Sequence, residues 1–186
     1  MQLFGEQSVP LLGIDISSAA IKVLQLSKSA GRYRVEHYAV EPLPPNVAND
    51  KSPAQVEAVG AAIKRAVARS GSKSKYAAVA ISGSSVITKI ITVPATDDEL
   101  AMEEQVYDEA SNHIPYQMDE VSLDFEVIGP VPNSDSVQVM IAAARTENVE
   151  ARQAALEYAG LTAKVVDVEV FAVENAFKLI SSQLVL

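Results

Sequence analysis

The sequence contains no cysteine and no tryptophan among its 186 residues. The lack of cysteine excludes disulfide bonds and thiolate metal sites, and it is typical of proteins of the reducing cytosol. Long apolar runs are also missing, since none approaches the ~20 residues that span a bilayer. The first residues, MQLFGEQSVPLLGID, lack the basic and apolar regions of a signal peptide. The sequence therefore predicts a cytoplasmic protein without direct membrane insertion.

Positive charge is scarce. The chain has 15 Lys and Arg against 24 Asp and Glu, which gives a net charge of −9 and a pI of about 4.7. Such a surface repels phosphate backbones and anionic headgroups, so nucleic acid and anionic lipid are poor partners. Hydrophobic residues make up 48% of the chain, which argues for a packed core and against disorder.

The spacing of apolar residues predicts an α/β layer fold. Strands are expected at 11–16, 20–26 and 33–40, joined by tight turns into an antiparallel meander. A helix is expected at 53–70, because Ser52–Pro53 is a helix start and apolar residues then recur at helical spacing. The remaining elements are expected as strands at 76–81, 86–93, 121–127, 137–144 and 164–168, and as helices after Thr96, from Thr146 and at 171–179.

Two groups of charged residues are interpreted as solvated surface. The sequence Thr96–Glu99 has the form of a capping box, and the acidic residues that follow it fit one exposed helix face. Lys64, Arg65 and Arg69 lie towards the end of the helix at 53–70, where they complement the helix dipole.

Several common site motifs are absent. The sequence has neither a G-x-x-x-x-G-K-[ST] phosphate loop nor a G-x-G-x-x-G dinucleotide motif. His37 and His113 lack neighbours at ligand spacing, which makes a metal centre built on histidine improbable. No serine has the setting of a nucleophile elbow.

The informative stretch is G-I-D-I-S-S-A-A-I-K, from Gly13 to Lys22. Asp15 ends one apolar strand, Ser17 and Ser18 form the turn, and Lys22 lies on the next strand. Such a turn offers N–H groups and hydroxyls to an anion, Asp15 can hold Mg²⁺ through water, and Lys22 can supply a charge to a phosphate. An ordinary hairpin with Asp15 in an Asx-type turn fits the same residues.

This hairpin is similar to the first phosphate motif, D-x-G-x-x-x-x-K, of the superfamily that holds actin, heat-shock chaperones, sugar kinases and FtsA. Ser17 stands here where that motif has glycine. A second segment, AGLTAKVVDVEVFA at 159–172, looks like the passage into the superfamily's connecting helix. The resemblance implies that Glu169 faces the water or metal of a bound nucleotide.

Longer segments resemble the PilM family of type IV pilus assembly proteins, in the same order along the chain. They are LLGIDISSAAIKVLQLSKSAGRYRVEHYAVEPLP, VAISGSSVITKIITVP, DEASNHIPYQMDEVSLDFEVIGP and ENVEARQAALEYAGLTAKVVDVEVFAVENAF. The resemblance implies an actin-like (ribonuclease H-like) subdomain 1A at 1–84 and 160–186. It also implies an FtsA-like βαββα subdomain 1C inserted at 85–159.

The same resemblance implies a function. Members of the family are expected to bind ATP with Mg²⁺ and to dock the cytoplasmic N-terminal peptide of PilN, within the inner-membrane pilus assembly complex. A superfamily enzyme, such as an ATPase or a sugar kinase, and a nucleotide-free interaction module are the alternatives.

The family's second phosphate hairpin has no counterpart before Leu186, which favours an N-terminal fragment that binds ATP weakly or not at all. Self-association is also expected, through apolar residues of the last helix. They are Val170, Phe171, Val173, Phe177, Leu179, Ile180, Leu184 and Val185.

Overall fold

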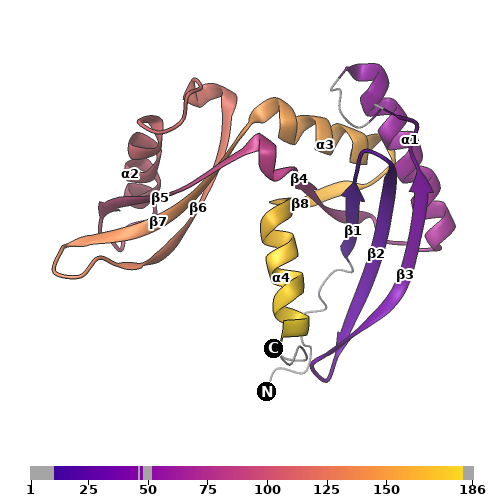
Figure 1. The fold of residues 1–186 in the computed structure, drawn as a ribbon, viewed down its shortest axis with the longest axis horizontal. Coiled ribbons are helices and arrows are strands. Elements are labelled where there is room, and N and C mark those ends of the chain that lie inside the picture. The colour runs from indigo at the N-terminus through magenta and orange to yellow at the C-terminus, as the bar shows by residue number, and fades with distance from the viewer. Residues whose placement is uncertain (1–10, 46, 48–51, 182–186) are drawn as a thin grey trace. The chain divides into compact units, whose positions relative to one another are not determined.

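The computed structural model describes residues 11–45, 47 and 52–181, which form two compact units (Figure 1). The first unit combines the chain up to Ile81 with the chain from Glu150 onwards, and the second is Ser82–Val149. The elements of the first unit are β1 (Leu11–Ile16), β2 (Ala20–Ser29), β3 (Arg32–Pro42), α1 (Pro53–Ser70), β4 (Tyr76–Ile81), most of α3 (Thr146–Tyr158), β8 (Thr162–Val168) and α4 (Glu169–Ser181).

The first unit is built on a five-stranded sheet in the order β3-β2-β1-β4-β8. β1, β2 and β3 form the expected antiparallel meander, whereas β4 pairs parallel to β1 and β8 parallel to β4. Alternate residues of β1, Leu12, Ile14 and Ile16, are buried on one face of the sheet. Helices α1 and α3 cover this face, and their apolar residues share one core with it.

Helix α1 has the predicted bounds. Its C-terminus is closed by Gly71, whose φ of 74° is the left-handed conformation that glycine adopts without strain. Its basic end is solvated, since the side chains of Arg65 and Arg69 are 56% and 60% exposed, but both also pair with β3. Arg65 Nε lies 2.7 Å from Glu41 Oε1, and Arg69 Nη2 lies 2.9 Å from Glu41 Oε2, so both side chains neutralise a buried carboxylate of β3. The hydrogen bond from Arg65, with the charge of Arg69, lowers the pKa of Glu41.

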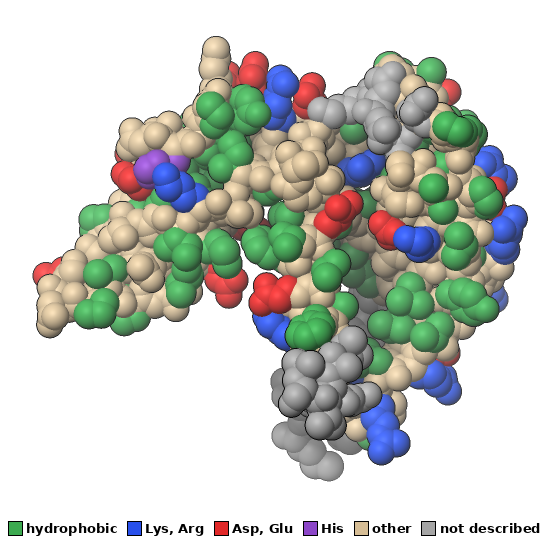
Figure 2. Space-filling view, in the orientation of Figure 1, with side chains coloured by type: hydrophobic (Ala, Val, Ile, Leu, Met, Phe, Trp, Pro, Cys, Tyr) green, Lys and Arg blue, Asp and Glu red, His purple; other side chains and the backbone are tan. Residues whose placement is uncertain are grey.

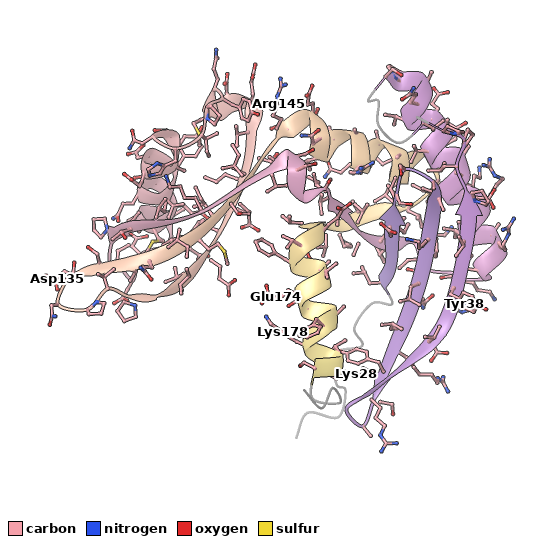
Figure 3. The ribbon with its side chains drawn as sticks, in the orientation of Figure 1. Lys28, Tyr38, Asp135, Arg145, Glu174 and Lys178 are labelled. Atoms are coloured by element: carbon pink, nitrogen blue, oxygen red, sulfur yellow. The ribbon has the colours of Figure 1, made fainter. Side chains whose placement is uncertain are left out.

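The opposite face of the sheet carries exposed apolar side chains on β2 and β3. Register pairs Leu24 with Tyr38 and Lys22 with Val40 on this face. Tyr38, labelled in Figure 3, is 73% exposed. Figure 2 shows hydrophobic side chains gathered over these two strands.

Helix α4 also keeps its apolar side chains in solvent. Val170, Val173, Phe177 and Leu179 are each at least half exposed. Glu174 and Lys178, labelled on this helix in Figure 3, form an ion pair of 2.9 Å. The side chain of Ile180 and the residues Leu184 and Val185, which were also expected in this stripe, lie outside the described part of the chain.

The second unit is a three-stranded antiparallel sheet in the order β5-β7-β6 with one helix packed on it. Its elements are two short 3₁₀ turns (Gly83–Ser85 and Met118–Glu120), β5 (Val86–Pro94), α2 (Glu99–Ser111), β6 (Val121–Pro130) and β7 (Ser136–Arg145). The predicted capping box is wrong in one detail, because Asp98 is the N-cap of α2. Its carboxylate accepts hydrogen bonds from Leu100 N and Ala101 N, while Thr96 accepts one from Asp98 N.

The bounds of the two units differ from the predicted ones. The sequence assigned 85–159 to the insertion, which includes the whole of α3, whereas the structure ends the second unit at Val149. Ala155 and Leu156 are the reason, since both are buried in the core of the first unit. Within the described residues, no helix is long and apolar enough to cross a membrane.

Candidate functional site

The candidate site lies at the edge of the first sheet where the parallel strands end. β1, β4 and β8 run in the same direction, so their carboxyl ends, at Ile16, Ile81 and Val168, meet at one edge. Asp15 is the penultimate residue of β1, and Glu169 directly follows β8. Topology therefore brings together two residues that are far apart in the sequence. In open α/β sheets this edge is where ligands bind.

The turn between β1 and β2 is held by Ser17. Its N–H and its hydroxyl both donate to Ala20 O, at 3.0 and 2.9 Å, and its Oγ accepts from Ala20 N at 3.2 Å. The single hydroxyl proton of Ser17 is thus used within the turn. The next residue, Ser18, is exposed and has no side-chain hydrogen bond to the described residues. Of the two predicted hydroxyl donors, Ser18 is the one presented to solvent.

Asp15 and Lys22 face each other across the hairpin. They are a directly paired couple of β1 and β2, and Lys22 Nζ lies 2.7 Å from Asp15 Oδ2. The expected placement of Lys22 on the next strand thus brings its side chain to Asp15. Both remain about half exposed, and the hydrogen bond to Asp15 raises the pKa of Lys22. A ligand from solvent can reach either charge.

Arg152 joins this edge from α3, and sequence reasoning missed it. Burial lowers the pKa of its guanidinium from the ordinary value, while the nearby carboxylates of Glu169 and Asp15 oppose that shift. It therefore lies within electrostatic reach of two predicted site residues. A single arginine in an amphipathic helix has no motif spacing, so only the folded arrangement reveals it.

A further carboxylate, Asp167, was also not predicted. Asp167 lies in β8 and pairs with Ala80 of β4, and the alternation of side chains along the strands places it on the face that carries Asp15. Two strand spacings separate β1 from β8, which is about 10 Å. Its Oδ1 accepts a hydrogen bond from Val168 N. Nothing in the sequence pattern distinguished this residue from an ordinary strand residue.

The residues at this edge fit a hydrated magnesium ion and a phosphate chain. Mg²⁺ keeps several waters and takes one or two carboxylates together with substrate phosphates. Asp15 and Glu169 would supply the carboxylates, and Lys22 would supply a positive charge. No group of three or more potential ligands that could hold a metal directly occurs within the described ranges. The predicted role of Asp15, to hold the ion through water, needs no such group.

The acidic helix of the second unit is solvated, as its pattern indicated. Glu103, Glu104 and Asp108 are exposed on α2. Its last acidic residue is engaged locally, because Glu109 Oε1 lies 3.0 Å from His113 Nε2. Nδ1 of that histidine is 3.0 Å from Lys89 Nζ. Since an ammonium can only donate, Nδ1 accepts and the ring donates from Nε2 to Glu109.

The first sheet has the strand order β3-β2-β1-β4-β8, a second unit is inserted between β4 and α3, and charged residues lie at the carboxyl edge. Together these features define an actin-like fold. The family described as type IV pilus assembly protein PilM matches residues 13–185. The chain belongs to this family.

A solved structure agrees with this assignment, and a second one shares the fold. A chain of the "PilM-PilN type IV pilus biogenesis complex" is 33% identical, with a TM-score of 0.81 over 94% of this chain and 51% of that one. This chain thus spans about half the length of that relative. The cytoplasmic domain of EpsL, an inner-membrane component of the type II secretion system of Vibrio cholerae, is 16% identical, with a TM-score of 0.55. The match covers 87% of this chain and 58% of that one, and it shows the shared fold.

Proposed function

We propose that this chain is the first lobe of an actin-like scaffold that docks the N-terminal peptide of PilN. Through that peptide it joins the inner-membrane pilus assembly complex at the cytoplasmic face. The observation that carries the proposal is the likeness to a chain of a PilM–PilN complex, at 33% identity over 94% of this chain. The full-length protein, with its second lobe, also binds Mg-ATP at the carboxyl edge of the first sheet.

The second unit suits a peptide partner. β5 and β6 are the edge strands of its sheet, and an edge strand offers unpaired N–H and C=O groups to an extended peptide. Ile90 on β5 is 55% exposed, and Val127 and Ile128 on β6 are 45% and 50% exposed. Acidic residues of α2 in the same unit favour a peptide with basic flanks.

Peptide binding is the first test. A fluorescent PilN-type N-terminal peptide should bind the 186-residue chain and the full-length protein, with a rise in anisotropy that saturates. A scrambled peptide of the same composition is the control, because it keeps the charge and loses the order of apolar residues. If the PilN-type peptide binds neither protein, or no better than the scrambled one, the adaptor function is refuted.

Nucleotide binding is the second test. In the full-length protein, Asp15→Ala should weaken Mg-ATP binding about tenfold, which is ~1.4 kcal/mol. The carboxylate is lost, and Lys22 loses the partner 2.7 Å away that orients it. Calorimetry measures both dissociation constants.

The control for this titration is Glu36→Ala. Glu36 of β3 pairs with Ser27 and Arg34, about 17 Å along β2 from Lys22. If the two variants bound Mg-ATP with equal affinity, the nucleotide site would not lie at this edge of the sheet. Absence of ATP binding by the wild-type protein would favour a nucleotide-free module, and turnover in a coupled ATPase assay would favour an enzyme.

Self-association belongs to the same proposal. The exposed apolar residues of α4 support it, since a helix with an unpartnered stripe is a ready interface.

A further inference from the structure

The first sheet has an open face, formed by the side chains of β2 and β3 that point away from α1 and α3. Along it the register places residues of the two strands side by side, in the pairs Lys22–Val40, Leu24–Tyr38, Leu26–Val35 and Lys28–Tyr33. The apolar members of these pairs are between 39% and 73% exposed. A contiguous apolar surface of this kind is typical of an interaction site.

A groove of about 690 Å³ follows the open face. Gly13 of β1 pairs with Leu24 of β2 on one side and with Ala78 of β4 on the other, so small residues lie next to a large one. Because glycine and alanine fill little of the space above the strands, they leave a hollow that Leu24, Leu26 and Lys28 border. β2 has 10 residues and is about 33 Å long, so a helix of several turns fits along it.

Helix α4 carries a second unpartnered apolar surface. Val170, Val173 and Phe177 recur at helical spacing and are 54%, 67% and 50% exposed. The helix has 13 residues and is about 20 Å long, so it fits within the length of the open face. An isolated helix of this length is marginal in water, so the stability of α4 depends on packing this stripe.

A single copy does not bring these two surfaces together. Glu169 begins α4 directly after β8, with no loop between them. β8 is one edge strand of the sheet, and three strand spacings, about 14 Å, separate it from β2. The helix contacts β8 and β4, while Leu24 and Leu26 stay exposed. A second copy removes this limit, because in a twofold dimer each copy gives one helix and receives one.

The charges beside the two surfaces are complementary. Lys28 borders the groove, its Nζ lies 5.1 Å from the centre of the Tyr33 ring, and it forms no ion pair with any described residue. Glu174 adjoins the apolar stripe of α4, three residues before Phe177 (Figure 3). Its ion pair with Lys178 is exposed, and such pairs hold their partners weakly. The carboxylate of Glu174 is therefore available to a second cation.

We propose that the open face of one copy receives helix α4 of a second copy, with the apolar stripe in the groove and Glu174 beside Lys28. The inference rests on the self-association proposed above and assigns the surface that receives the helix. The net charge of −9 opposes association, but this repulsion is screened beyond about 8 Å at physiological ionic strength. Two identical helix contacts hold the same dimer, so each one stabilises the other.

Crosslinking between single-cysteine variants tests the contact, since the chain has no cysteine of its own. Leu26→Cys and an affinity-tagged Val173→Cys are purified separately, mixed in physiological salt and treated with a short bismaleimide. The mixture should give mainly the crosslinked heterodimer, and each variant alone should give much less. In the control, Lys64→Cys, at an exposed position of α1, replaces Leu26→Cys and should give little heterodimer.

Sedimentation of charge variants tests the pairing of Lys28 with Glu174. Lys28→Glu and Glu174→Lys should each weaken the dimer about tenfold, because an attraction becomes a repulsion. The double variant should recover most of the loss, since the two charges attract again. Lys64→Glu makes the same change in net charge away from the groove and should leave the dissociation constant unchanged. All these positions are exposed, so each variant should fold as the wild type does.

Three results would contradict the proposal. A wild-type monomer at high concentration in salt overturns both the self-association and this contact. If Val173→Cys crosslinks mainly to itself, the dimer is held by α4 against α4, and only the contact proposed here is overturned. The contact is also overturned if Lys28→Glu weakens the dimer no more than Lys64→Glu does. Binding of the PilN-type peptide is measured separately, so failure of the adaptor function remains distinguishable from failure of this contact.

Discussion

Replacing Leu156 with alanine is expected to destabilise the first unit by about 2–5 kcal/mol, the usual cost of cutting a buried leucine to alanine. Leu156 is fully buried, in the core that also contains Leu12 and Ile63. This side chain packs α3 against the buried face of the first sheet, which α1 also covers. For a chain of this size the loss lowers the unfolding midpoint by about 2–4 °C for each kcal/mol.

Hydrogen exchange locates the effect. Amides of β1 and β4 should lose protection in Leu156→Ala, whereas those of β5 and β7 should keep it, since the two units have separate cores. Leu100→Ala is the matched control, because Leu100 is a leucine of α2 that is 72% exposed. If amides of the second unit lost protection instead of those of the first, α3 would pack in the second unit, as the sequence predicted.

Much of the fold could be predicted because it depends on local signals. Helix α1 has a proline in its first turn, which fixes φ at a helical value, and a glycine just past its end, which adopts the left-handed φ without strain. The hairpin that carries Asp15 and Lys22 was predicted because a short turn separates two apolar strands, and in the structure this turn sets their register. In each case the deciding residues are neighbours in the sequence.

The errors have the opposite cause. Thr96 and Asp98 are both good N-cap residues, and the choice between them depends on where α2 packs. The small and apolar residues of α3 would suit either core, so the sequence pattern placed the helix in the insertion, whereas the structure places most of it in the first unit. Arg152 and Asp167 become site residues only because parallel strands end at one edge of the sheet. That edge is formed by segments more than a hundred residues apart.

A valine at position 60 should destabilise the first unit at least as much as typical overpacking does, by about 1–3 kcal/mol. Gly60 is buried in α1, where α3 passes very close. A Cβ there would lie 2.7 Å from Tyr158 Cβ and 2.8 Å from Ala155 O. The carbonyl belongs to the backbone of α3, so it moves only if the two helices separate. Separation would open the core between them.

The matched control for Gly60→Val is Ala58→Val, which adds the same side chain at an exposed position of the same helix. It should cost only the lower helix propensity of valine, at most about 0.7 kcal/mol. That propensity also favours valine slightly over glycine, so any large loss in Gly60→Val comes from packing. Urea unfolding of both variants measures the difference. Equal urea midpoints for the two variants would mean that α1 and α3 do not approach each other closely at Gly60. In that case α3 would not pack in the first unit.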